Sequence, residues 1–129
     1  MIEIRKTERF ARWIDKLRDV RGRAQIQARI ERLTGGNPGD VKRIREGVSE
    51  MRIDYGTGYR VYFKKRGREL IILLAGGDKS TQAKDIEAAL RLARNLTEGD
   101  HGKDGHNALR RSRASKDPRG NGGISGGLS

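Results

Sequence analysis

The side chains best suited to chemistry are basic and aromatic, and they gather around one glycine turn. A β-hairpin turning at Gly56-Thr57-Gly58 would place Arg52 and Arg60 on the same face of a sheet, with Tyr62 one pair further along. RNA cleavage by the 2'-hydroxyl needs a base, a proton donor for the 5'-oxygen and cations that stabilise the phosphorane. Arginine clamps phosphate through its planar fork, so this group suits RNA cleavage.

Further residues could extend this surface. Lys79 follows the next strand and can serve as an acid, or as a base if neighbouring cations lower its pKa. Lys64 is on the same strand face as Tyr62, and the tyrosines of the hairpin, Tyr59 and Tyr62, could stack on an unpaired base. The spacing leaves one alternative open, a solvated sheet face in which the arginines pair with nearby carboxylates.

Several other chemistries are poorly supported by the composition. The chain has no cysteine, which excludes disulfides, thiolate catalysis and cysteine metal sites. Both histidines, His101 and His106, lie in the C-terminal tail, so a paired-histidine nuclease would require the tail to fold back. Helical spacing scatters Asp78, Asp85 and Glu87, so we expect no metal and no other cofactor.

A meander of three strands should carry the basic residues. Residues 50–55 and 59–64 alternate between apolar and polar side chains, the pattern of half-buried antiparallel strands. Residues 70–75 are continuously apolar, which indicates a central strand buried on both faces. Short strands are also predicted at Ile2–Lys6 and Val41–Ile44.

Two helices are predicted before the meander and one after it. Apolar side chains recur at helical spacing in the first two: Phe10, Trp13, Ile14 and Leu17, then Ile26, Ile30 and Leu33. Thr7 can cap the first helix, and Gly35-Gly36 ends the second. The third begins after Ser80 or Thr81 and ends near Leu96. The fold class is therefore α+β, with two N-terminal helices packed on a small antiparallel sheet and a C-terminal helix.

Charge and composition divide the chain after residue 96. Residues 97–129 contain eight glycines and no aromatic residue, so we expect a disordered tail after a domain of residues 1–96. The tail has six basic and four acidic residues, so most of the net charge of +12 belongs to the domain. This charge indicates a nucleic acid, an anionic surface or an acidic protein as partner. With neither a signal peptide nor a membrane-spanning run, we expect a cytoplasmic protein without membrane partners.

Three segments carry a family resemblance: residues 36–42, 47–63 and 73–86. They resemble the RelE/ParE toxin superfamily, and more narrowly its HigB-like addiction-module killer proteins. The most specific part is Gly-Tyr-Arg-Val-Tyr at residues 58–62, followed by Gly-Gly-Asp-Lys at residues 76–79. The resemblance extends from about Ile4 to Leu96.

The resemblance implies a RelE-like fold and the toxin of a type II toxin–antitoxin system. Such toxins of the RelE and HigB type cleave messenger RNA on the ribosome without a metal, and a cognate antitoxin, usually of the helix-turn-helix type, neutralises them. Arg60 corresponds to the strand arginine of the family, Arg52 to a basic residue in the preceding strand, and Lys79 to the basic position after the last strand.

The resemblance leaves the general acid and base open. Family members often have a further Tyr, His or Asp near the C-terminal end, where this chain offers Asp78, Gln82 and Asp85. ParE-type relatives share the fold but inhibit DNA gyrase, so the alternatives are a gyrase inhibitor or a basic nucleic-acid-binding protein.

Overall fold

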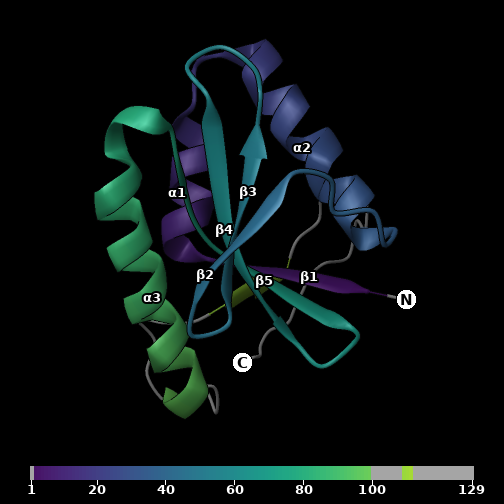
Figure 1. The fold of residues 1–129 in the computed structure, drawn as a ribbon, viewed down its shortest axis with the longest axis vertical. Coiled ribbons are helices and arrows are strands. Elements are labelled where there is room, and N and C mark those ends of the chain that lie inside the picture. The colour runs from purple at the N-terminus through teal and green to yellow at the C-terminus, as the bar shows by residue number, and fades with distance from the viewer. Residues whose placement is uncertain (1, 100–108, 112–129) are drawn as a thin grey trace.

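The computed structural model describes residues 2–99 and 109–111, with side chains through residue 96 (Figure 1). The elements in chain order are β1 (Glu3–Thr7), α1 (Glu8–Lys16), α2 (Val20–Thr34), β2 (Val41–Arg45), β3 (Val48–Ile53), β4 (Tyr59–Arg66), β5 (Leu70–Gly77), the 3₁₀ turn η1 (Lys79–Thr81), α3 (Gln82–Gly99) and β6 (Leu109–Arg111). The predicted α+β class is confirmed, with two helices before the meander and one after it.

The strands form one mixed sheet in the order β2-β3-β4-β5-β1-β6. Strands β2 to β5 form an antiparallel meander, as the sequence predicts. Strand β1 runs parallel to β5, from Glu3 opposite Leu70 to Lys6 opposite Leu73. The long apolar strand β5 thus lies between an antiparallel neighbour, β4, and a parallel one, β1, so the sheet is mixed rather than wholly antiparallel.

Helices cover both faces of the sheet and create two apolar cores (Figure 1). The first core lies between α1, α2 and the sheet: Phe10, Ile14, Ile26, Ile30, Leu33, Met51, Ile53, Tyr59, Val61, Phe63, Ile71 and Leu73. The second core lies between α3 and the other face: Val48, Tyr62, Ile72, Leu74, Ala75, Ala89, Leu90, Ala93 and Leu96. Alternate residues of each strand enter different cores because successive side chains point to opposite faces.

Side-chain caps fix where the helices begin. The hydroxyl of Thr7 accepts a hydrogen bond from the amide of Phe10 and donates one of 2.7 Å to the carbonyl of Leu74, so it caps α1 as predicted and ties it to β5. Asp19 caps α2 by accepting from the amide of Gly22. Helix α3 begins at Gln82, directly after Thr81 as predicted, and Asp78 caps the η1 turn that precedes it.

Two elements extend into the segment after residue 96. Helix α3 continues to Gly99, and Leu109–Arg111 pairs with β1 as strand β6. The rest of the predicted tail lies outside the described residues. Within the described part of the chain, no helix has the length and apolar character needed to cross a membrane.

Candidate functional site

The hairpin of β3 and β4 places two arginines directly opposite each other. Arg52 of β3 pairs in register with Arg60 of β4, and Glu50 pairs with Tyr62. The turn has Gly56 at φ 60° and Gly58 at φ 85°, left-handed conformations that glycine adopts without steric cost. The predicted placement of both arginines on one face is thereby confirmed.

Arg60 is held in place, yet its hydrogen bonds are incomplete. Its side chain is 12% exposed, and its Nε lies 3.6 Å from Oε2 of Glu50. Nη1 donates a 3.1 Å hydrogen bond to the carbonyl of Gly58. Nε is buried and has no hydrogen-bond partner among the described residues. The Nε of Arg60 therefore faces Glu50 through an ionic contact rather than a hydrogen bond.

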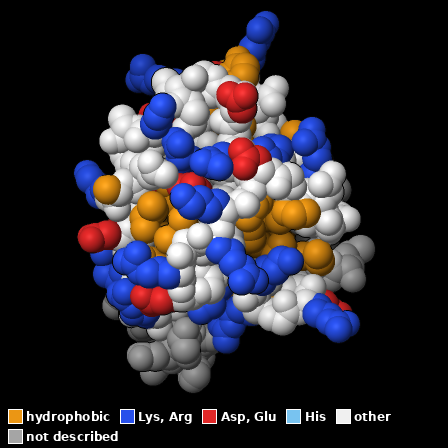
Figure 2. Space-filling view, in the orientation of Figure 1, with side chains coloured by type: hydrophobic (Ala, Val, Ile, Leu, Met, Phe, Trp, Pro, Cys, Tyr) orange, Lys and Arg blue, Asp and Glu red, His pale blue; other side chains and the backbone are white. Residues whose placement is uncertain are grey.

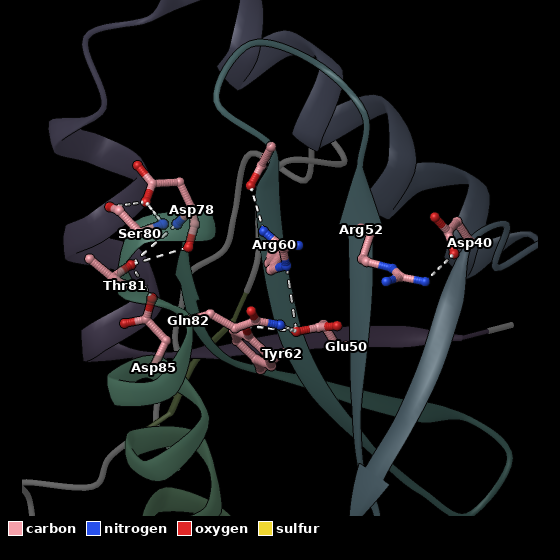
Figure 3. A network of polar contacts seen from close by, with 11 residues as sticks. Asp40, Glu50, Arg52, Arg60, Tyr62, Asp78, Ser80, Thr81, Gln82 and Asp85 are labelled. Atoms are coloured by element: carbon pink, nitrogen blue, oxygen red, sulfur yellow. Dashed lines mark hydrogen bonds and ion pairs between the residues drawn. The ribbon is translucent and has the colours of Figure 1, made fainter.

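Glu50 is the centre of a buried polar cluster beside Arg60 (Figure 3). Its Oε2 accepts hydrogen bonds from the Tyr62 hydroxyl at 2.9 Å and from Nε2 of Gln82 at 2.8 Å. Burial, and then the hydrogen bond to Glu50, raise the pKa of Tyr62, so its hydroxyl stays protonated and donates. Residues from β3, β4 and the start of α3 therefore meet at one carboxylate.

Arg52 lies nearer the solvent and turns toward Asp40, away from Arg60 (Figure 3). Its Nη2 is 3.5 Å from Oδ1 of Asp40, and the two side chains are 43% and 59% exposed. Arg29 of α2 holds the backbone here by donating to the carbonyls of Arg52 at 2.6 Å and Pro38 at 3.0 Å. Burial lowers the pKa of Arg29. The Nε of Arg52 is also buried without a hydrogen-bond partner among the described residues.

Asp78 occupies the start of the turn after β5. Its Oδ1 accepts from the amide of Ser80 at 2.8 Å and from the Ser80 hydroxyl at 2.6 Å. The hydroxyl bond is the main cause that lowers the pKa of Asp78, with the nearby charge of Arg60 contributing less. This carboxylate already accepts from the Ser80 amide, and Gly76 and Gly77 belong to strand β5, where they pair with β4, so Gly76-Gly77 is not a phosphate-binding loop.

Asp85 is buried under the same turn, and its contacts are structural. Its Oδ2 accepts from the hydroxyl of Thr81 at 2.5 Å, and its Oδ1 lies 3.8 Å from Nη2 of Arg9. A Cβ at Gly77 would overlap this carboxylate, so the glycine makes room for it. Within the described ranges, no group of three or more histidine, aspartate or glutamate side chains is arranged to hold a metal ion.

The two tyrosines require a correction to the predicted RNA surface. Both rings are buried, Tyr59 in the core under α1 and α2 and Tyr62 in the core under α3. The Tyr59 hydroxyl donates to Asp19 and the Tyr62 hydroxyl to Glu50. Neither ring can stack on a base, because α3 and the α1–α2 hairpin cover the faces that strand alternation alone leaves open.

The other predicted site residues are dispersed. Gln82 lies beside Arg60, but its side-chain amide donates to Glu50. Lys64 is half-buried and lies opposite Val48, at the far end of the hairpin from Arg52. Lys79 is exposed in η1, two residues beyond Gly77, which pairs with Arg60. Around this site Figure 2 shows lysine and arginine side chains distributed over the visible face, with fewer acidic ones between them.

Sequence reasoning missed Glu50 as a member of the site. Strand alternation assigns it only to the polar face of β3. The signal that could have found it is the hairpin register, because the turn that places Arg52 opposite Arg60 also places Glu50 opposite Tyr62. A carboxylate paired with a tyrosine that an adjacent helix buries becomes an acceptor for that tyrosine.

Comparison with known proteins identifies the family of this chain. Residues 12–98 match the family described as "Phage derived protein Gp49-like (DUF891)". A protein of Haemophilus influenzae, described as uncharacterized, is 53% identical over 95 residues, which cover 74% of this chain and 96% of that protein. The chain therefore belongs to the Gp49-like family of phage-derived proteins, a toxin-like family within the RelE/ParE-like toxin superfamily.

Proposed function

We propose that this protein is a HigB-like toxin of a type II toxin–antitoxin system that cleaves messenger RNA on the ribosome. The observation that carries the proposal is the cross-strand pair of Arg52 and Arg60, which lie opposite each other on one face of the hairpin. Both side chains are partly exposed, 43% for Arg52 and 12% for Arg60, and guanidinium groups match the charge of a phosphodiester. Membership of a toxin-like family and the net charge of +12 support the same substrate class.

The proposed reaction is a transesterification within the RNA. The 2'-oxygen attacks the adjacent phosphorus, and the bond from phosphorus to the 5'-oxygen breaks. This yields a 2',3'-cyclic phosphate and a 5'-hydroxyl. A base takes the proton of the 2'-hydroxyl, and an acid gives a proton to the leaving 5'-oxygen. Arg60 stabilises the phosphorane, Arg52 positions the RNA, and Lys79 is the candidate for proton transfer.

A toxin of this kind requires a protein that neutralises it in the cytoplasm. The antitoxin that we propose is a helix-turn-helix protein, in line with the resemblance to HigB-like toxins. The basic surface in Figure 2 is suited to an acidic partner as well as to RNA.

Primer extension on a defined message in a purified translation system tests the proposal. The wild type and Arg60→Ala are compared with and without ribosomes. The matched control is Arg68→Ala, which removes an exposed arginine between β4 and β5, at the opposite end of β4 from Arg60. We expect cuts that require ribosomes, persist in the control and fall by at least about 100-fold in Arg60→Ala.

The contrary result is also informative. Intact message at protein doses that arrest growth would reject messenger RNA cleavage. A supercoiling assay with purified gyrase would then test the ParE-like alternative.

A further inference from the structure

We propose that Glu50 is the positioning residue of this site, a buried carboxylate that orients Arg60 without touching the RNA. The catalytic consequence rests on the proposed function, whereas the orientation of Arg60 is a property of the chain itself. The inference starts from the cluster in Figure 3, in which Glu50 lies between Arg60, Tyr62 and Gln82.

Three donors converge on a single oxygen of Glu50. The Tyr62 hydroxyl and the Gln82 amide donate to Oε2 at 2.9 and 2.8 Å. Nε of Arg60 approaches the same oxygen to 3.6 Å. The two neutral donors fix the carboxylate, and the contact with Arg60 is ionic, since 3.6 Å is too long for a hydrogen bond. Glu50 therefore attracts the guanidinium by its charge rather than through a hydrogen bond.

Burial makes this attraction strong and keeps Glu50 away from substrate. Its side chain is 1% exposed, and Arg60 is the cation that pairs with it. A charge at such a position is far less screened than one at the surface, so the pair holds its orientation. Removing the negative charge would leave Arg60 with its Gly58 hydrogen bond and the weaker attraction of Asp78.

Three structural elements meet at this carboxylate. Glu50 belongs to β3, Tyr62 and Arg60 to β4, and Gln82 is the first residue of α3. The position of the carboxylate is thus set by the hairpin register and by the docking of α3. Arg60 acquires its orientation only when both are in place.

The orientation is tested first, without any RNA. In the full-length protein, the ¹⁵Nε–¹Hε signals of the arginines are recorded for the wild type, Glu50→Gln and Glu46→Gln. Glu46→Gln is the matched control, because it breaks the exposed ion pair with Arg94 elsewhere on the molecule. We expect Glu50→Gln to shift the Arg60 signal and to speed its exchange with water at least fivefold. An Arg60 signal that is unchanged in Glu50→Gln would overturn the inference.

The catalytic consequence is tested by a double-mutant cycle in the ribosome assay. Single-turnover rates are compared for the wild type, Glu50→Gln, Arg60→Ala and the double variant. We expect Glu50→Gln to slow cleavage about tenfold at an unchanged half-saturating ribosome concentration, and to cost nothing more once Arg60 is absent. Equal losses in both backgrounds would show that Glu50 acts independently of Arg60 and would overturn the catalytic part of the inference.

Two further results separate the possible failures. If Glu50→Gln does not fold, Gln82→Ala keeps the charge and removes one donor, and we expect the same shift of the Arg60 signal in smaller measure. If the wild type does not cleave message, the proposed function fails, while the NMR comparison still decides whether Glu50 orients Arg60.

Discussion

The Tyr59 hydroxyl donates a 2.7 Å hydrogen bond to the carboxylate of Asp19, which lies 40 positions earlier in the chain. The same carboxylate accepts from the amide of Gly22 at 2.9 Å and so caps α2. Tyr59 immediately precedes Arg60, and its ring packs edge-on against Trp13. The start of α2 is thereby fastened to the strand that carries the proposed catalytic arginine.

This contact predicts a loss of stability in acid. The hydrogen bond from Tyr59 is the main cause that lowers the pKa of Asp19 below its ordinary value of 3.8. A lowered folded-state pKa stabilises the protein above that value, and the benefit disappears as the pH falls through the folded-state pKa. We expect Asp19→Asn to lower the melting temperature at pH 7 and the two curves to converge as the pH falls through the folded-state pKa of Asp19. Asp15→Asn, at an exposed position of α1, is the control and should melt like the wild type at pH 7.

Arg52 and Asp40 predict a change in the salt dependence of RNA binding. If Arg52 contacts one phosphate, Arg52→Gln should reduce the slope of log affinity against log salt by about 0.7 for a single-stranded, 2'-O-methylated RNA. Asp40→Asn should strengthen binding, because it removes the carboxylate 3.5 Å from Arg52, and should change stability by less than about 1 kcal/mol. An unchanged slope for Arg52→Gln, matching that of Arg12→Gln on α1, would place the RNA elsewhere.

Lys79 and Lys84 form a matched pair for testing proton transfer. Both are exposed, but Lys79 is two residues from Gly77, the partner of Arg60, whereas Lys84 lies on α3. We expect Lys79→Ala to slow single-turnover cleavage by about 100-fold, in the range of general acid–base catalysis, and Lys84→Ala to have no effect. Equal rates for the two variants would remove Lys79 from the proposed mechanism.

Gly76 predicts a stability cost that is independent of function. A Cβ at this position would lie 2.3 Å from the ring of Trp13, so alanine must displace that ring. We expect Gly76→Ala to lower the free energy of unfolding by about 1–3 kcal/mol in urea denaturation. Gly35→Ala is the control, because its nearest neighbour is an ordinary 3.5 Å contact and its φ is −86°. If Gly76→Ala is as stable as this control, the packing of Trp13 against β5 is wrong.

Much of the fold could be predicted because its elements carry local patterns. The apolar stripe from Phe10 to Leu17 marks α1, and alternation around Gly56-Thr57-Gly58 fixes the hairpin register. The parallel pairing of β1 with β5 could not be read in this way. The paired residues lie far apart in the sequence, so no local pattern connects them. Their pairing depends on how α1 and α2 return the chain to the sheet.

The sequence predicted the positively charged residues of the site but not the side chains that surround them. Spacing placed Arg52 and Arg60 on one face, but the same rule suggested that Tyr62 was open to a base. Helix α3 decides the matter, because it buries Tyr62 and turns Glu50 into the acceptor for its hydroxyl. A helix covers only part of a sheet face, and tertiary packing decides which part. The sequence of a single strand contains no information about that packing.

The order of the strands also governs when a growing chain can become active. The first strand, β1, pairs only with β5 and β6 in the described structure, and both are synthesised after it. Arg60 needs Gly77 beside it in the sheet, and Glu50 needs Gln82 at the start of α3. A translation product that stops before Gln82 therefore lacks the assembled cluster, so under the proposed function the host ribosome would release it as a harmless fragment.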